Sequence, residues 1–309
     1  MGERKPVVSV VVPTRDRAAM LRAALASVRA AEGDGFAVEL IVADNGSTDD
    51  TRDVAREFGA RVIEAPRPGA SAARNDGLRA ATGDYVTFLD DDDVWLPGHP
   101  RAHVELLERR PDLGAAVGRV QLADPEMRPF GEPYPERWPA DGDMVAAFFR
   151  DGPQVASVVS RIEVRDTVGF FDEGLPSSED WQWHLRLAMQ HRIGFVTCTC
   201  ILFRQRPVAT HDDLEWLRLR TDGPAFWRAL RITGKRRPPL RDVVHAYLTY
   251  HGRYYAYFSR SAVVHGERGE RAAARRCVWR AVRASPLHAA YHLARGGEMR
   301  RAVRALMNR

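Results

Sequence analysis

Short apolar runs alternate with amphipathic stretches over the first ninety residues of the chain. Residues 7–12 form a continuous valine-rich run, which is typical of a strand buried on both faces. Residues 17–31 then place their apolar side chains on one helical stripe. The same order of strand and helix is repeated along this part of the chain. The pattern predicts strands at residues 7–12, 38–43, 61–63 and 85–89, and helices at residues 17–31, after Ser47 or Thr48, and at residues 70–81.

This alternation predicts an α/β fold in which a mostly parallel sheet is flanked by helices on both faces. In such sheets, ligands bind beyond the carboxyl ends of the strands. Asp44 follows the second expected strand, and Asp90–Asp93 follow the fourth. Both groups of acids are therefore expected at the edge of the sheet where a ligand binds.

The remaining sequence has a mixed part and a helical part. Proline and acidic residues make residues 122–138 a predicted surface loop. From Asp212 onward the pattern is helical. We expect an α/β domain at residues 1–211 and a helical C-terminal region at residues 212–309. The other expected features are strands at 154–160 and 193–203, a turn at 169–174, a helix at 179–190 capped by Ser178, and helix breaks at Gly223-Pro224, Pro238-Pro239 and Ser285-Pro286.

Composition places the chain among globular proteins. Hydrophobic residues make up 45% of the 309 residues and charged residues 28%, so wholesale disorder is not expected. No apolar run approaches the roughly 20 residues that span a bilayer. The first residues also lack the charged, apolar and small segments of a secretory signal, and we therefore expect a cytoplasmic location.

The C-terminal region is rich in arginine, and the formal net charge of the chain is +5. A basic face could contact nucleic acid, an anionic membrane or an acidic acceptor. The simpler interpretation is a solvated helix surface. Aromatic residues are not interleaved with these arginines and no nucleic-acid-binding module is recognisable, so we expect no nucleic-acid partner and retain a peripheral membrane contact as a hypothesis.

Apolar residues also recur at helical spacing in the C-terminal region. Such a surface is expected to pack on the α/β domain or on a second subunit, and a homo-oligomer is one consequence. The residues concerned are Leu240, Val243, Val244, Tyr247, Leu248, Tyr254, Tyr255 and Phe258.

The three cysteines are too few for a disulfide framework. Cys198 and Cys200 lie two residues apart on an expected strand, and Cys277 is alone. A metal site would need a second ligand pair, and only Cys277 is left. We therefore expect buried or inert thiols.

Four consecutive aspartates, Asp90–Asp93, end the fourth expected strand. Like charges so close raise one another's pKa, so the cluster is costly unless a cation occupies it. Mg²⁺ and Mn²⁺ are hard cations that take oxygen ligands and share them with substrate phosphates. The alternative is a solvated acidic turn in which Asp93 caps the following helix.

Several segments, in this order, resemble the motifs of the inverting family 2 glycosyltransferases with the GT-A fold. Residues 8–14, 42–49 and 72–77 resemble the nucleotide-binding segments of that family. Residues 83–93 resemble the segment with its Asp-x-Asp metal motif. The segments Val-Gly-Phe-Phe-Asp-Glu at 168–173 and Ser-Glu-Asp-Trp-Gln-Trp at 178–183 resemble the acceptor-side turn and the catalytic helix. The resemblance covers about residues 5–205.

For the donor side, the resemblance implies that Asp44 accepts a hydrogen bond from the imide N–H of uracil or thymine. Arg74 would lie near the base and the diphosphate, where its fork of donors suits anionic groups. Pro13 and Thr14 would shape the pocket through their backbone. A UDP-sugar is the expected donor, with a dTDP-sugar next.

For the metal, Asp90 and Asp92 match the two aspartates of Asp-x-Asp, and Asp92 is the expected direct ligand of Mn²⁺ or Mg²⁺. Asp91 would help to bind the donor, and Asp91 and Asp93 would support the ligands or cap a helix. Many relatives carry a Tyr-Arg-x-His segment after the last strand, where this chain has Phe-Arg-Gln-Arg at 203–206. Arg206 could replace that histidine beside the leaving group, and His211 is a weaker candidate for a metal ligand.

For the acceptor side, the resemblance assigns the catalytic base to Asp180. A direct displacement with inversion needs a base that removes the acceptor proton on the face opposite the leaving diphosphate. Glu179 would orient the acceptor, and Trp181 and Trp183 could stack on a sugar ring, although a tryptophan in a helix is more often a core residue.

Together these features predict a metal-assisted, inverting transfer of a sugar from a nucleotide-sugar to an acceptor hydroxyl. The acceptor stays open: a saccharide, a lipid, a peptide or a small natural product all fit. The alternative is a protein of the same fold that binds nucleotide-sugars without catalysis, and intact Asp92 and Asp180 argue against it.

Overall fold

The structure, a computed structural model, consists of two compact units. The first comprises Met1–Gln205 and Ala225–Arg237, and the second comprises Arg206–Pro224 and Pro238–Arg309. The expected division at residue 211 lies near the first boundary, but residues 225–237 group with the first unit. The structure describes residues 4–33, 35–138, 147–148, 152–205, 208–232, 240–295, 297, 300–301 and 303–304.

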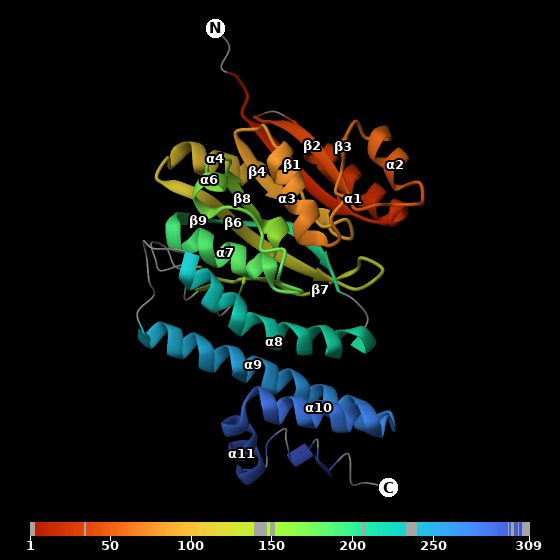
Figure 1. Ribbon diagram of the computed structural model, residues 1–309, viewed down its shortest axis with the longest axis vertical. Coiled ribbons are helices and arrows are strands. Elements are labelled where there is room, and N and C mark those ends of the chain that lie inside the picture. Colours follow the sequence, from red (N-terminus) through yellow and green to blue (C-terminus); the bar gives the residue numbers. More distant parts are fainter. Residues whose placement is uncertain are drawn as a thin grey trace. The chain divides into compact units, whose positions relative to one another are not determined.

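The first unit is built on one mixed sheet with the strand order β3-β2-β1-β4-β8-β6-β9-β5, in which β7 also pairs with β6 (Figure 1). β3, β2, β1 and β4 are parallel, and β8 is inserted antiparallel between β4 and β6. The predicted parallel order is thereby confirmed for the first four strands, whereas the sheet as a whole is mixed. The strands are β1 (Val7–Thr14), β2 (Ala37–Asp44), β3 (Arg61–Glu64), β4 (Tyr85–Phe88), β5 (Val94–Trp95), β6 (Leu113–Ala123), β7 (Pro129–Tyr134), β8 (Val158–Arg161) and β9 (Arg192–Arg204).

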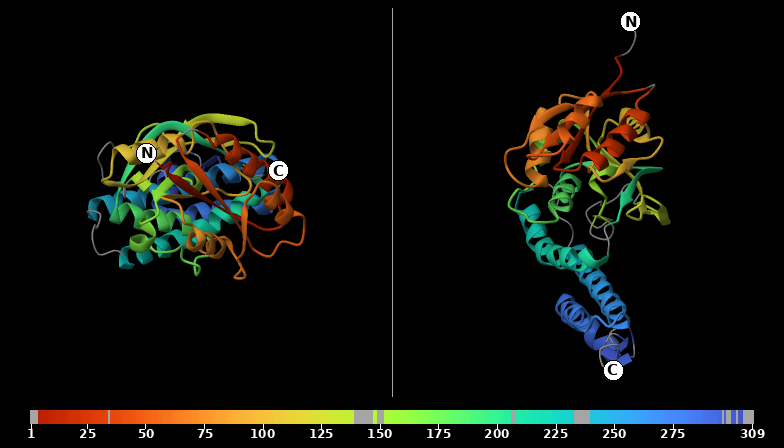
Figure 2. Two further views of the ribbon diagram at one scale, coloured as in Figure 1. Left: turned by 90° about the horizontal axis from the view of Figure 1, so that it is seen from above. Right: turned by 90° about the vertical axis from the view of Figure 1, so that its right-hand side faces the viewer.

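Helices cover both faces of the sheet, because successive side chains of a strand point to opposite faces. Val8 and Val10 pack in one apolar cluster with Leu21 of the first helix. Val11, of the opposite parity, lies against Gly77 of the third helix. The side view in Figure 2 shows α1 and α3 on opposite sides of the strands. The helices of this unit are α1 (Ala18–Ala31), α2 (Thr51–Glu57), α3 (Ala70–Ala80), α4 (Arg101–Arg109), the short 3₁₀ turn η1 (Val155–Ser157), α6 (Val164–Val168) and α7 (Glu179–Gln190).

The register of the strands brings their carboxyl ends to one edge. Thr14, the last residue of β1, pairs with Asp44, the last residue of β2. Val11 pairs with Phe88, so the residues that follow β4 leave the sheet beside the end of β1. The aspartates that begin at Asp90 therefore lie at the same edge as Asp44, as the sequence predicts.

Close packing of α3 on β1 explains the glycine of the Ala-Ala-Arg-Asn-Asp-Gly segment. A Cβ added at Gly77 would stand 2.2 Å from Val11 Cγ1. Gly77→Ala is therefore expected to destabilise the first unit by about 1–3 kcal/mol through overpacking, which exceeds the gain of ~0.5–1 kcal/mol from higher helix propensity. Urea unfolding measures this difference. Gly33→Ala is the matched control, since its Cβ would meet nothing within 4 Å, and equal midpoints for the two variants would contradict the packing argument.

The second unit is helical. Its elements are most of α8 (Val208–Ile232), α9 (Leu240–Glu267), α10 (Arg271–Ala284) and α11 (Pro286–Arg295). α10 packs along α9, and Tyr254, Tyr255 and Phe258 are buried with Cys277 and Ala281 in the core of this unit. Within the described part of the chain, no helix combines the length and apolar character needed to cross a membrane.

Three expectations about secondary structure are wrong at least in part. Residues 155–157, expected to belong to a strand at 154–160, form the 3₁₀ turn η1 before β8. Residues 122–138 are not only a loop, because they contain the end of β6 and the whole of β7. β7 is exposed for most of its length, which removes the apolar alternation that marks a strand. α8 continues through Gly223-Pro224 instead of breaking there, whereas the break at Ser285-Pro286 is confirmed and that at Pro238-Pro239 lies outside the described residues.

The apolar residues of the C-terminal region divide into two groups. Tyr254, Tyr255 and Phe258 pack inside the second unit itself, which corrects their expected packing on the α/β domain or on a second subunit. Leu240, Val244 and Leu248 are exposed along α9. The side chains of Val243 and Tyr247 are not among those that the structure describes.

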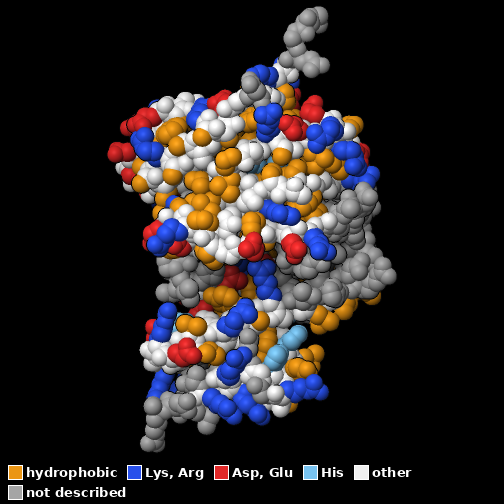
Figure 3. Space-filling model, turned by 180° about the vertical axis from the view of Figure 1, so that it is seen from behind, with side chains coloured by type: hydrophobic (Ala, Val, Ile, Leu, Met, Phe, Trp, Pro, Cys, Tyr) orange, Lys and Arg blue, Asp and Glu red, His pale blue; other side chains and the backbone are white. Residues whose placement is uncertain are grey.

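On the face shown in Figure 3, Lys and Arg side chains gather over the helices of the second unit. The exposed arginines of α10 and beyond are Arg271, Arg275, Arg276, Arg283, Arg295, Arg300, Arg301 and Arg304.

Candidate active site

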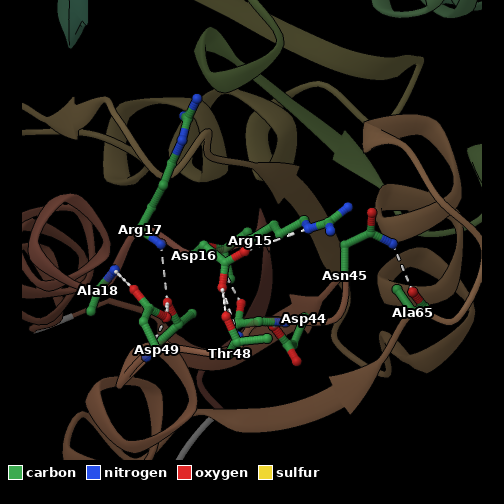
Figure 4. Close-up of polar contacts among 12 residues, drawn as sticks. Arg15, Asp16, Arg17, Ala18, Asp44, Asn45, Thr48, Asp49 and Ala65 are labelled. Carbon is green, nitrogen blue, oxygen red and sulfur yellow. Dashed lines mark hydrogen bonds and ion pairs between the residues drawn. The ribbon is translucent and has the colours of Figure 1, made fainter.

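The loops that follow β1 and β2 are bonded to each other (Figure 4). The Asp16 N–H donates to Ser47 Oγ at 3.0 Å, and the Thr48 N–H donates to Asp16 Oδ1 at 2.6 Å. Asp49 Oδ2 accepts the Ala18 N–H at 3.2 Å, at the start of α1. The Asn-Gly-Ser-Thr-Asp segment after β2 thus fixes the loop after β1 and the first turn of the helix behind it.

Asn45 extends this framework to the next loop. Its Nδ2 donates to the carbonyl oxygens of Ala65 and Arg67, each at 2.7 Å, and its Oδ1 accepts the Gly69 N–H at 3.0 Å. The chain between β3 and α3 is therefore held against the end of β2, and α3 begins at a fixed place on the edge of the sheet.

Asp44, predicted to contact the base, is fully buried at the end of β2. Its Oδ1 accepts the Ser47 N–H at 3.0 Å, and its Oδ2 accepts the Arg52 Nε–H at 2.5 Å. Burial by itself raises the pKa of Asp44, but the hydrogen bonds from Ser47 and Arg52 lower it below its usual value. The group is thus an ionised carboxylate, and the Arg52 side chain pairs with the oxygen that could accept an imide N–H.

Asp90, Asp92 and Asp93 bring carboxylate oxygens within 4.8 Å of one another. Asp93 is 2% exposed, and its Oδ1 accepts the Arg204 N–H at 2.9 Å. Burial and the charges of Asp90 and Asp92 raise the pKa of Asp93 well above its usual value. A hard divalent cation would remove this repulsion, so the three carboxyl groups fit the predicted metal.

Asp93 was expected to support a ligand or cap a helix, and the capping role is wrong. α4 begins only at Arg101 and has no side-chain cap, whereas Asp93 is bonded to the backbone of β9. The side chain instead faces Asp90 and Asp92 as a third candidate ligand. The sequence did not indicate Asp93 as a metal ligand, because four consecutive aspartates cannot be told apart by residue type. Their side chains point to different neighbours only in the folded turn after β4.

Asp91 points to the loop after β1. Its Oδ2 accepts the Thr14 hydroxyl at 2.7 Å, and its Oδ1 accepts an Arg17 Nη1–H at 2.8 Å. Arg17 also donates to Asp92 Oδ2 at 3.1 Å and is 38% exposed. Thr14 therefore takes part in this cluster through its side chain, whereas the expectation concerned its backbone, and Arg17 is a cation of the site that was not predicted from the sequence.

Arg74 joins the two halves of the site. Its Nη2 donates to Asp90 Oδ1 at 2.7 Å, and its Nη1 donates to Glu179 Oε1 at 2.8 Å. The residue is 5% exposed, and its guanidinium lies 5.7 Å from the centre of the Phe171 ring. Burial alone would lower the pKa of Arg74, but Asp90, Glu179 and Asp180 raise it overall, so the group is a fixed cation. Its two terminal nitrogens hold carboxylates of the site and are not directed at open solvent.

Glu179 and Asp180 form the first turn of α7. Burial and the Asp180 charge raise the pKa of Glu179, while Arg74 opposes the rise. Asp180 is half-buried, and its Oδ1 accepts the Trp181 N–H at 2.7 Å. Ser178 precedes the helix with φ 64° and makes no capping hydrogen bond, which corrects its expected role as a cap.

The two tryptophans of α7 differ. Trp183 is 1% exposed, donates from Nε1 to the Gly169 carbonyl at 2.8 Å, and stacks on Phe171 at 5.2 Å. A ring enclosed in this way cannot stack on an acceptor sugar, so Trp183 is a core residue. Trp181 is half-buried and donates to the Phe148 carbonyl at 3.1 Å.

Asn75 has a role that its motif did not reveal. Its Nδ2 donates to the Phe171 carbonyl at 3.0 Å, and its Oδ1 accepts the Phe171 N–H at 2.7 Å. Nδ2 also donates to Glu173 Oε1 at 2.8 Å. α3 is thereby tied to the turn before α7.

Arg206 lies outside the residues that the structure describes, and so does the side chain of His211. The roles expected for these two residues therefore rest on the sequence alone.

Comparison with known proteins identifies relatives of the first unit. Residues 9–140 match the family model described as Glycosyl transferase family 2. Glycosyltransferase AglE of Haloferax volcanii is 30% identical over 198 residues, which cover 60% of this chain and 62% of AglE. The chain spans 57% of the length of the first curated relatives that it matches and 62% of the length of AglE.

Two solved structures share the fold. The mannosyltransferase PcManGT of Pyrobaculum calidifontis, in complex with GDP-Man and Mn²⁺, has a TM-score of 0.60 at 20% identity, covering 99% of this chain and 88% of its own. TarS 1–349 of S. aureus, in complex with UDP-GlcNAc, has a TM-score of 0.60 at 15% identity, covering 97% and 90%. The first unit therefore has the expected GT-A fold, a mixed sheet flanked by helices.

Proposed function

We propose that this chain, whose residues 9–140 belong to glycosyl transferase family 2, moves a sugar from a UDP-sugar to an acceptor hydroxyl with inversion at the anomeric carbon. The observation that carries the proposal is the bridge made by Arg74. One guanidinium holds Asp90 of the acid cluster and Glu179 of the α7 turn, so that the donor side and the acceptor side are built as one unit.

On the donor side, Asp92 with Asp90 and Asp93 is the proposed holder of Mn²⁺ or Mg²⁺. When bound, the ion supplies positive charge to the departing diphosphate. Arg17 is half-exposed beside Asp91 and Asp92, and we assign it a contact with the same phosphates. Support for a bound nucleotide-sugar comes from TarS and PcManGT, which share this fold.

On the acceptor side, Asp180 is the proposed base. Glu179 is held by Arg74 and is therefore suited to orient the site rather than to take a proton. Asp180 stands next to it in the first turn of α7. Trp181 stays a candidate for acceptor contact, whereas Trp183 is withdrawn because it is buried.

The choice of UDP rests on Asp44. A uracil imide N–H would pair with its carboxylate once the Arg52 side chain moves aside, whereas cytosine has an unprotonated N3 at that position and cannot donate there. Calorimetry with UDP and with CDP, each in the presence of Mn²⁺, is expected to give the lower Kd for UDP by about tenfold or more, since one such hydrogen bond to a charged group contributes ~1.5–3 kcal/mol. Equal affinities for the two nucleotides would remove Asp44 from base recognition, and tighter binding of CDP would replace UDP as the donor nucleotide.

A further inference from the structure

Three helices of the second unit bring together a carboxylate, an imidazole and a thiol. They are Asp212 of α8, His265 of α9 and Cys277 of α10, on helices labelled in Figure 1. His265 Nε2 lies 2.8 Å from Asp212 Oδ2, and Cys277 Sγ lies 3.2 Å from the same oxygen. One ligand atom from each residue falls within 4.8 Å of the others.

We propose that Asp212, His265 and Cys277 form a zinc site that fastens α8, α9 and α10 to one another. Zn²⁺ takes nitrogen, sulfur and carboxylate oxygen ligands at about 2.0 to 2.3 Å, so that ligand atoms of a tetrahedral site stand about 3.3 to 3.8 Å apart. The present separations of 2.8 and 3.2 Å need only small rotations of the side chains to reach that spacing.

Neighbouring residues hold the side chains of His265 and Asp212 through hydrogen bonds, as they commonly do around metal ligands. His265 Nδ1 is bonded to Glu270 Oε2, which leaves Nε2 to face Asp212. A histidine ligand commonly donates its other ring N–H to a carboxylate in this way. Asp212 Oδ1 accepts the hydroxyls of Ser261 at 2.7 Å and Tyr257 at 2.9 Å, so its Oδ2 is directed at His265 and Cys277.

The backbone of Asp212 is held as firmly as its side chain. Arg280 donates from Nη1 to the Asp212 carbonyl at 2.9 Å and from Nη2 to Asp213 Oδ1 at 2.5 Å. The start of α8 is thereby fixed on α10, the helix that carries Cys277. Ligands placed on rigid helices and supported by further hydrogen bonds lose little freedom when an ion binds.

Charge also favours zinc at this place. Binding displaces the thiol proton of Cys277 to solvent, and the thiolate and the Asp212 carboxylate together balance the two positive charges of the ion. Cys277 is 1% exposed, whereas the Glu270 carboxylate is 50% exposed and gives the site a side open to water. The fourth position is then available to a water molecule.

A second group of possible metal ligands lies in the first unit. It provides the control for the proposed zinc site, because it also contains a buried cysteine. His99, His103 and Cys200 are all fully buried, and no carboxylate belongs to the group. A divalent ion there would leave uncompensated positive charge in an apolar core, which is costly. We therefore assign zinc to the cluster of the second unit alone.

The test uses the full chain, freed of metal with a chelator and titrated with Co²⁺, which reports a thiolate ligand through a charge-transfer band in the near ultraviolet. The wild-type chain is expected to develop this band with one equivalent of Co²⁺ and to lose it when Zn²⁺ is added. The Cys277→Ser variant is expected to lack the band, and the Cys200→Ser variant is expected to keep it.

Asp212→Asn keeps the shape of the side chain but removes its charge, and it is the second variant in case Cys277→Ser does not fold. Its thiolate band should appear only at Co²⁺ concentrations at least about tenfold higher than for the wild type. A wild-type chain without the band, a band that survives in Cys277→Ser, or one that is lost in Cys200→Ser would each overturn the proposal.

Discussion

The Asp180→Asn variant is expected to turn over at least about 10² and up to about 10⁴ times more slowly than the wild-type chain with a saturating acceptor. Asparagine keeps the size of the side chain and can still accept the Trp181 N–H, but it cannot take a proton at pH 7. The affinity for UDP in the presence of Mn²⁺ should stay unchanged, because the proposed role of Asp180 is on the acceptor side and not in donor binding. Initial rates and calorimetry on the same preparation measure both effects.

Two further variants make this result specific. Asp166→Asn changes an exposed carboxylate of α6 and should behave as the wild type. Glu179→Gln breaks the pair with Arg74 and should disturb the site without removing the base. A larger loss of turnover in Glu179→Gln than in Asp180→Asn would transfer the role of base to Glu179.

The Asp92→Ala variant is expected to bind UDP in the presence of Mn²⁺ at least about 100-fold more weakly than the wild-type chain, since even residues behind a metal ligand contribute factors of 10 to 100. Loss of one charge also relieves the repulsion that raises the pKa of Asp93, so the fold should be retained. Calorimetry with UDP, with and without Mn²⁺, measures the change.

Asp53→Ala is the control for this variant, because it removes a carboxylate that is 72% exposed on α2 and pairs with Arg56 of the same helix. Its metal-dependent binding should match that of the wild type. If Asp92→Ala retains wild-type affinity and wild-type dependence on Mn²⁺, the acid cluster is not the metal site.

Much of the fold follows from short-range pattern in the sequence. The strands β1, β2 and β4 are largely buried, β3 is short and half-buried at its centre, and the helices between them are amphipathic or rich in small residues. Each was expected at its place. The sequence was less informative for β6 and β7. β7 pairs with β6, and most of its residues are exposed. Because an exposed strand does not need apolar residues at every second position, its sequence lacks the alternation by which a strand is predicted.

The site shows the same difference between local and distant information. That Asp44 and the aspartates after β4 share one edge follows from the order of strands. That Arg74 bridges Asp90 and Glu179 could not be predicted, because residues 74 and 179 are 105 positions apart and meet only in the folded chain. Arg17 was missed for a similar reason, since its partners Asp91 and Asp92 lie more than 70 residues away.

The expected role of Ser178 shows the limit of giving a residue type its most common role. Ser178 precedes a helix and was expected to cap it, yet it has a left-handed backbone and makes no capping hydrogen bond with its side chain. Cys277 was expected to be a buried or inert thiol, and it is buried. Its neighbours in the fold, Asp212 and Ser261, lie on two other helices and could not be predicted from the sequence.

The central claim is that the edge formed by the acid cluster and α7 transfers a sugar from a nucleotide donor. The measurement that tests it most directly is the release of nucleoside diphosphate from a panel of UDP-, dTDP- and GDP-sugars by the full chain, with Mn²⁺ or Mg²⁺ and with chelator. The account predicts release from a UDP-sugar that requires the metal and falls to background in both Asp92→Ala and Asp180→Asn. Release that is the same in chelator, or that persists undiminished in both variants, would contradict it.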